Sequence, residues 1–155
     1  MLAKNYHRLL LALALTSAVA ALPSVAEAGP GIRAGVTDDP DAIFVGFDYR
    51  YPLTHLSRNA YVRLEPGVDL GVPEGPVDFF IRGTRHFEFL FPLSGNLAIY
   101  PLVGPALVYY NWDGGDDTEV GVNAGFGLQI SEFSMELWAG ISDIPDITLA
   151  FGVSF

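Results

Sequence analysis

The chain has 155 residues, of which 50% are hydrophobic and 17% are charged, and its formal net charge is −10. It contains no cysteine, which excludes a disulfide framework and thiolate chemistry. Its only lysine is Lys4 and its arginines form no cluster, so a nucleic-acid partner is not expected.

The N-terminal segment has the three regions of a secretory signal peptide. A positively charged start is followed by an apolar run over residues 9–22 and by a small-x-small pattern that ends at Ala28. The alternative is a membrane-anchoring helix, but that needs about 20 apolar residues, and this run is shorter. We therefore predict a signal peptide over residues 1–28 and a single domain over residues 29–155.

The predicted mature chain is strongly acidic and contains no lysine. Six arginines stand against 17 acidic residues, which gives a formal net charge of −11. The surface of a soluble protein normally mixes both signs and uses lysine freely. This composition is therefore unusual for a protein that is surrounded by water.

Period-two alternation of apolar and polar residues runs through the mature chain, and no stretch shows a convincing helical period. Turn signals rich in Pro, Gly, Asp and Ser separate the alternating segments. The predicted strands cover residues 31–37, 42–51, 60–72, 78–91, 97–112, 119–131, 133–142 and 146–155.

The two faces of these strands differ in kind. One is apolar, as in the last strand, where Ile147 and Leu149 lead into Phe151, Val153 and Phe155. The other is rich in glycine and carries basic and acidic residues in near balance. Its charged and imidazole side chains are Arg33, Asp48, Arg50, Arg63, Glu65, Asp69, Arg82, His86, Glu88 and Glu136.

Two architectures produce such alternation. A soluble sandwich or lipocalin-like barrel turns the apolar face inward, whereas a membrane barrel turns it toward lipid. Glycine weakens a solvent-facing strand but suits a crowded interior, and charges removed from water need partners. The pattern favours an all-β, closed, antiparallel, eight-stranded transmembrane up-and-down β-barrel, with these ten residues as a salt-bridged network in its lumen.

Acidic residues gather in alternate loops of this barrel. With eight strands both chain ends lie on one side, taken as periplasmic, and the first, third, fifth and seventh loops face outward. These loops hold 11 of the 17 acids: Asp38, Asp39, Asp41, Glu74, Asp78, Asp113, Asp116, Asp117, Glu119, Asp143 and Asp146. The opposite turns hold His55, Arg58 and a single acid, Glu132. A general preference of Asp for turns does not explain this one-sidedness.

With its leader, its eight strands, the segment YPLVGPALVYYNW at 100–112 and its terminal strand, the chain resembles the small OmpA/OmpX-type outer-membrane barrels of Gram-negative bacteria. In that family the last strand ends in phenylalanine and is read by the barrel assembly machinery. The resemblance implies outer-membrane lipid and that machinery as partners, and implies that Phe151, Val153 and Phe155 form an assembly signal.

Three features depart from the family pattern. The predicted outer loops are short, and Pro66, Pro101 and Pro105 fall inside strands, where they could mark bulges or kinks. Arg85 falls on the apolar face by strict alternation, unless a bulge near Gly83 turns it inward or the register of this strand differs from the one assumed.

The residues do not predict an enzyme or a cofactor. His86 shares its face with Thr84 and Glu88 at a spacing of two, which is a poor geometry for a catalytic triad. The acidic segment DGGDDTE is a weak candidate for a divalent-cation loop, although a solvated loop is the simpler interpretation. Its possible ligands are Asp113, Asp116, Asp117 and Glu119.

We therefore predict an integral outer-membrane barrel with a structural or surface-interaction role and an unidentified external ligand. The alternatives are a narrow pore or small-molecule transport barrel, a lipid-modifying enzyme, and a soluble lipocalin-like binder in the periplasm.

Overall fold

The computed structural model describes residues 28–155 except residues 59, 95, 143 and 146. Apart from Ala28, the predicted signal peptide therefore lies outside the described residues. No helix in the described part is long and apolar enough to cross a membrane. The strands are β1 (Gly29–Asp38), β2 (Ala42–Ser57), β3 (Ala60–Pro73), β4 (Val77–Ser94), β5 (Leu97–Trp112), β6 (Gly115–Ile130), β7 (Phe133–Ile141) and β8 (Ile147–Ser154).

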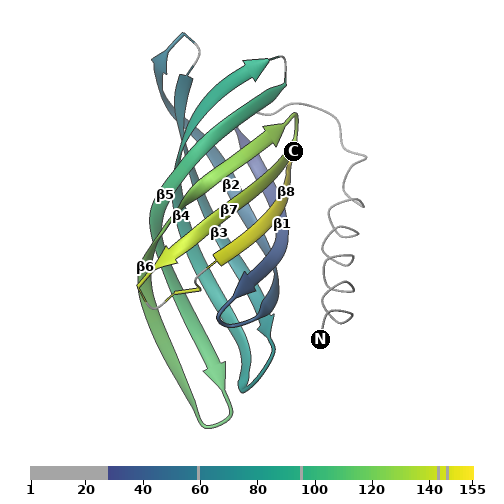
Figure 1. The fold of residues 1–155 in the computed structure, drawn as a ribbon, viewed down its shortest axis with the longest axis vertical. Helices are drawn as coiled ribbons and strands as arrows, with labels where there is room; N and C mark the ends of the chain where they lie inside the picture. The colour runs from purple at the N-terminus through teal and green to yellow at the C-terminus, as the bar shows by residue number, and fades with distance from the viewer. Residues whose placement is uncertain (1–27, 59, 95, 143, 146) are drawn as a thin grey trace.

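The eight strands form a closed barrel in which each pairs with its neighbours in the chain (Figure 1). Closure comes from antiparallel pairing of β1 with β8, which runs from Gly31 opposite Ser154 to Asp38 opposite Ile147. A closed barrel has no unpaired edge, so its backbone groups can be satisfied without water. The predicted all-β, eight-stranded, up-and-down barrel is confirmed.

Two hairpins are longer than the sequence predicted. We expected a turn over residues 113–118, but β6 already begins at Gly115, and Trp112 pairs with Gly115 across a two-residue Asp113-Gly114 turn. Asp-Gly is a strong signal for a tight hairpin, because Gly readily takes the positive φ that such turns require, here 103° at Gly114. The acids after this turn therefore lie on a strand.

At the opposite end, β2 continues to Ser57, although residues 52–59 were predicted as a turn. Its pairing with β3 shifts register between Pro52 and Thr54 and again between His55 and Ser57. Such irregularities accommodate a proline that cannot donate a ladder bond.

The outward face of the barrel forms an apolar belt. Phe47, Val120 and Phe126 are each more than 60% exposed, and apolar residues recur at alternate positions along every strand. Val153 was predicted on this face, and its register places it there, between Ile32 and Phe133. It is nonetheless only 2% exposed, so within the terminal strand the belt is not uniformly open.

Inside the barrel, large side chains lie opposite glycines. Phe80 pairs with Gly71 and Tyr100 pairs with Gly127 on the adjacent strand. A Cβ atom added to Gly71 would lie 2.1 Å from the Phe80 ring, and one added to Gly127 would lie 2.2 Å from the Tyr100 ring. The glycine-rich inner face therefore provides the space into which the neighbouring strands project their bulk.

Arg85 lies on the outward face and is exposed. The pairing of β3 with β4 runs without a shift from Tyr61–Leu90 to Gly71–Phe80, so the bulge considered near Gly83 does not occur. Arg85 is the ninth of the 18 residues of β4, and its side chain emerges near the middle of the apolar belt.

The in-strand prolines mark no bulge either. Pro66, Pro101 and Pro105 all lie in stretches of constant register. Pairing between β4 and β5 is interrupted opposite Pro101 and Pro105, and it resumes in the same register on either side. Proline lacks the N–H group that would close the ladder there, and the neighbouring pairs hold the strands in place.

Candidate functional site

All ten residues predicted for the lumen are buried inside the barrel. They come from five strands, β1 to β4 and β7, and no member is more than 7% exposed. We call this set the interior charge network: Arg33, Asp48, Arg50, Arg63, Glu65, Asp69, Arg82, His86, Glu88 and Glu136.

Asp69 is the centre of one half of this network. Arg33 donates to it from Nε (2.7 Å to Oδ1) and from Nη2 (3.1 Å to Oδ2). Arg82 donates to the same carboxylate from Nε (2.9 Å to Oδ2). Arg33 also donates to Thr84, and Arg82 donates to Thr148 of β8. A buried carboxylate held by two guanidinium groups is strongly fixed in place.

Glu65 links this half to Arg50. Its Oε1 accepts from Arg33 at 3.3 Å, and its Oε2 accepts from Arg50 Nε at 2.9 Å. Arg50 also donates to the hydroxyls of Ser134 and Ser154, which brings β7 and β8 into the network. Asp48 lies 3.9 Å from Arg50 Nε.

The remaining members form separate contacts. Arg63 donates from Nε to Glu88 and from Nη1 to Gln129 Oε1 at 2.9 Å. Tyr100 donates its hydroxyl hydrogen to Glu136 Oε1 at 2.6 Å.

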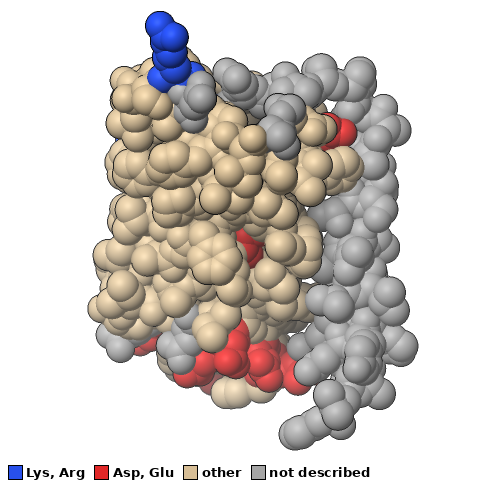
Figure 2. Space-filling model, turned by 45° about the horizontal axis from the view of Figure 1, so that its top comes forward, with Lys and Arg blue, Asp and Glu red and all other residues tan. Residues whose placement is uncertain are grey.

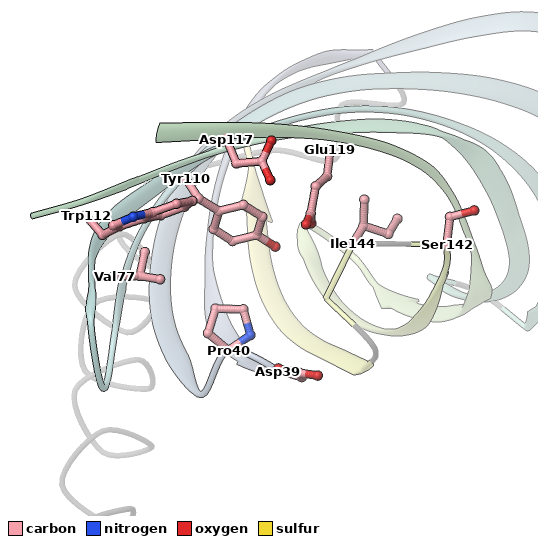
Figure 3. Close-up of a pocket in the computed structure, with 9 residues that line it drawn as sticks. All are labelled: Asp39, Pro40, Val77, Tyr110, Trp112, Asp117, Glu119, Ser142 and Ile144. Atoms are coloured by element: carbon pink, nitrogen blue, oxygen red, sulfur yellow. The ribbon is translucent and has the colours of Figure 1, made fainter. Parts of the chain in front are cut away.

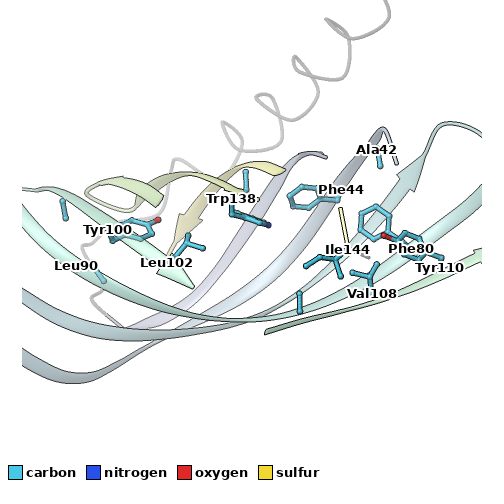
Figure 4. Packing of buried hydrophobic residues seen from close by; sticks show 13 residues of the cluster. Ala42, Phe44, Phe80, Leu90, Tyr100, Leu102, Val108, Tyr110, Trp138 and Ile144 are labelled. Atoms are coloured by element: carbon cyan, nitrogen blue, oxygen red, sulfur yellow. The ribbon is translucent and has the colours of Figure 1, made fainter. Parts of the chain in front are cut away.

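Aromatic residues pack among these charges, and the sequence analysis did not assign them to the lumen. The Arg82 guanidinium lies 4.7 Å from the ring centre of Phe44, 5.4 Å from that of Trp138 and 5.8 Å from that of Phe80. Figure 4 shows these rings within the buried cluster that also contains Tyr100, Val108 and Ile144. Strict alternation would have found them, because they share strand parity with the charges.

Apolar layers flank the charge network along the barrel. Phe44 and Phe80 lie nearer the starts of β2 and β4 than the buried charged residues of those strands, and Ile144 belongs to the same cluster. Leu90 lies nearer the opposite end of β4 and is fully buried. The described interior is thus filled by side chains, as expected where eight strands leave little bore.

The His86 row does not assemble a nucleophile and a base. His86 Nε2 lies 3.1 Å from Asn123 Nδ2, whereas Thr84 accepts from Arg33 and Glu88 accepts from Arg63. Each of the three side chains therefore has its own partner, as expected for structural roles.

One group in the described part of the chain has the donor types of a metal site. Ligand atoms of Glu65, His86 and Glu136 lie within 4.8 Å of one another. Both Glu65 oxygens, however, already accept from Arg33 and Arg50, whose charges would oppose a cation.

The acidic segment after β5 does not converge on a cation site. Asp116 and Asp117 are consecutive residues of β6, opposite Asn111 and Tyr110, so their side chains leave opposite faces of the strand. The described acids of this segment are not among the groups with metal-ligand spacing.

The acidic end, which was predicted to face outward, is visible as a cluster of carboxylates at one end of the molecule, with a basic side chain at the other (Figure 2). Asp113, Asp116 and Asp117 are exposed there, as are Asp38 and Asp78. Of the 11 acids predicted for this end, Asp143 and Asp146 lie outside the described residues.

The predicted assembly signal lies on the last strand beside β1. Phe151 is opposite Ala34, and Val153 is opposite Ile32. Phe155 follows the strand, donates its backbone N–H to Pro30 O at 3.0 Å and is 38% exposed.

No protein-family model matches the chain, and no curated protein sequence matches it. Solved structures do resemble it. The crystal structure of Ail, the attachment invasion locus protein of Yersinia pestis, superposes with a TM-score of 0.50 at 16% identity, over 82% of this chain and 93% of that chain. A structure of Ail with the heparin analogue sucrose octasulfate gives a TM-score of 0.47 at 16% identity, over 83% and 98%. The chain therefore has the fold of the small eight-stranded outer-membrane β-barrels.

Proposed function

We propose that this chain is an integral outer-membrane barrel of a Gram-negative bacterium, delivered by a cleaved signal peptide, with a structural or surface-interaction role. Its partners are outer-membrane lipid, the barrel assembly machinery and a ligand outside the cell. The observation that carries the proposal is a filled lumen beneath an acidic outer end.

The apolar belt supports a lipid environment. A monomeric soluble protein rarely exposes a continuous apolar surface of this extent, whereas a membrane barrel requires one. The inverse arrangement, with charges buried and paired inside, fits a polar lumen from which bulk water is largely excluded.

The filled interior argues against the transport alternative. A pore needs a continuous water path, but Arg63 donates to Gln129 of β6 and Arg82 donates to Thr148 of β8, so both side chains reach across the lumen. Both arginines are at most 1% exposed. Phe44 and Phe80 close the space on the outer side of these two arginines. Contact with the surroundings is left to the two ends of the barrel.

Cysteine labelling in intact cells tests the orientation, because the chain has no native cysteine. Asp113→Cys places a thiol in the exposed β5–β6 turn, and Arg58→Cys places one in the exposed β2–β3 turn. We expect a membrane-impermeant maleimide to label the first variant in intact cells and the second only after permeabilisation. The reverse pattern, or labelling of both only in the soluble periplasmic fraction, would overturn the proposal.

Conductance in planar bilayers tests the filled lumen. We expect the purified barrel to insert without producing discrete current steps. Reproducible single-channel steps from folded protein, absent in the unfolded control, would favour the narrow pore instead.

A further inference from the structure

A cavity of about 430 Å³ opens at the outer mouth of the barrel (Figure 3). It is built from the β1–β2 turn, the start of β4, the β5–β6 hairpin and the connection between β7 and β8. The residues that line it are Asp39, Pro40, Val77, Tyr110, Trp112, Asp117, Glu119, Ser142 and Ile144. A volume of this size suits a small organic molecule.

Two aromatic rings and an apolar floor shape the cavity. Tyr110 and Trp112 are inward-facing residues at the end of β5, and Ile144, which is buried, belongs to the same apolar cluster as Tyr110. Tyr110 is 7% exposed, and its hydroxyl points into the cavity in Figure 3. The Tyr110 hydroxyl therefore adds a polar group to the wall of the cavity.

The charged side chains of the cavity favour a positively charged ligand. Asp39, Asp117 and Glu119 contribute carboxylates from two elements, and the described lining contains no lysine or arginine. The arginines of the described chain lie elsewhere: four in the interior charge network, Arg58 at the opposite end and Arg85 in the apolar belt. An anion would be repelled here, and a cation would be attracted.

The lining favours an organic cation over a metal ion. These carboxylates are not grouped at metal-ligand spacing, whereas Glu65, His86 and Glu136 are. Aromatic faces beside carboxylates attract alkylammonium groups through cation–π and charge-assisted contacts, and the apolar floor accommodates an alkyl stem.

We propose that this cavity, which we call the mouth pocket, binds an alkylammonium group on a short apolar stem. The ammonium lies between the aromatic rings and the β6 carboxylates, and the stem packs toward Ile144 and Val77. The source is either a free amine or a lysine side chain of a peptide outside the cell. That the ligand reaches the mouth pocket from outside the cell rests on the proposed function, in which this end of the barrel faces outward.

Calorimetric titration of the folded barrel in detergent tests this inference. The probe is n-hexylammonium, and hexanoate serves as the anion control. Asp117→Asn removes a pocket charge, whereas Asp116→Asn removes the same charge from the adjacent residue on the other face of β6. We expect saturable binding of hexylammonium, weakened about tenfold by Asp117→Asn and unchanged by Asp116→Asn.

If Asp117→Asn and Asp116→Asn weakened binding equally, the binding would depend only on the net charge of the protein. If hexanoate bound as tightly as hexylammonium, both probes would be partitioning into the detergent. Either result would overturn the inference. Competition by a lysine tripeptide would support a presented side chain as the source, and its absence would support a free amine. The titration does not depend on membrane orientation, so it can succeed while the labelling of Asp113→Cys fails, or the reverse.

Discussion

Arg33 and Asp69 form a two-point ion pair across a strand that separates them. Arg33 is on β1 and Asp69 is on β3, and Gly46 of β2 is the cross-strand partner of both. A Cβ atom at Gly46 would lie 2.1 Å from Asp69 Oδ1. The missing side chain is therefore what lets the guanidinium reach the carboxylate at 2.7 and 3.1 Å.

Gly46→Ala should destabilise the barrel by about 3 kcal/mol, because the new methyl group displaces the Asp69 carboxylate from Arg33. Urea unfolding in lipid vesicles measures the change. Gly83→Ala is the matched control, since its nearest neighbouring atom would be 4.0 Å away, and we expect it to be near neutral. Equal effects of the two substitutions would show that glycine content alone, and not this contact, sets the stability.

Asp69→Asn should cost about 3–5 kcal/mol of unfolding free energy, because it leaves Arg33 and Arg82 buried without their shared carboxylate. Asp78→Asn, at an exposed position of the acidic end, should change stability by less than about 0.5 kcal/mol. The same urea titration compares them. A loss no larger for Asp69→Asn than for Asp78→Asn would contradict a stabilising role for the network.

Arg85→Leu should stabilise the barrel in vesicles by about 2–4 kcal/mol, because it removes a cation from the middle of the apolar belt. Arg58→Leu, in the exposed β2–β3 turn, is the control and should have little effect. If Arg85→Leu were destabilising instead, Arg85 would have a favourable partner in the membrane that the isolated chain does not contain.

Phe155→Ala should lower the amount of assembled barrel in cells more than it lowers the stability of the folded protein. Phe155 is partly exposed, and its hydrogen bond to Pro30 O is made by the backbone N–H, which alanine retains. Quantification of folded barrel in the envelope, beside refolding yield in detergent, separates the two effects. Phe91→Ala is a control of similar exposure at the same end. Equal loss of assembly in both variants would argue against a signal in the terminal strand.

Alternation in the sequence predicted which residues enter the lumen but not how they pair. The parity of Arg33, Asp69 and Arg82 was sufficient to place them inside. Their contacts join β1 to β3 and β3 to β4, and the first depends on barrel curvature and on Gly46. The alternation of side chains along a strand predicts neither the curvature of the barrel nor the contact that the missing side chain of Gly46 permits.

The sequence also did not predict the aromatic rings inside the barrel or the mouth pocket. The rings were missed because every large apolar residue was expected on the outward face. Phe44 and Trp138 are apolar and yet lie inside, where cations stack on them. The mouth pocket combines β5, β6 and the β7–β8 connection, and such a juxtaposition appears only once the barrel closes. Arg85 is the opposite case, because simple alternation placed it correctly and the suggested bulge was wrong.

Gel mobility of the outer-membrane fraction, with and without boiling in SDS, is the most direct test that this chain forms a closed barrel in that membrane. We expect the unboiled protein to resist SDS and to migrate at a different apparent mass from the boiled chain, because the strand ladder has no free edge. Recovery as a soluble periplasmic protein with no mobility shift would contradict the membrane assignment and would favour a lipocalin-like binder.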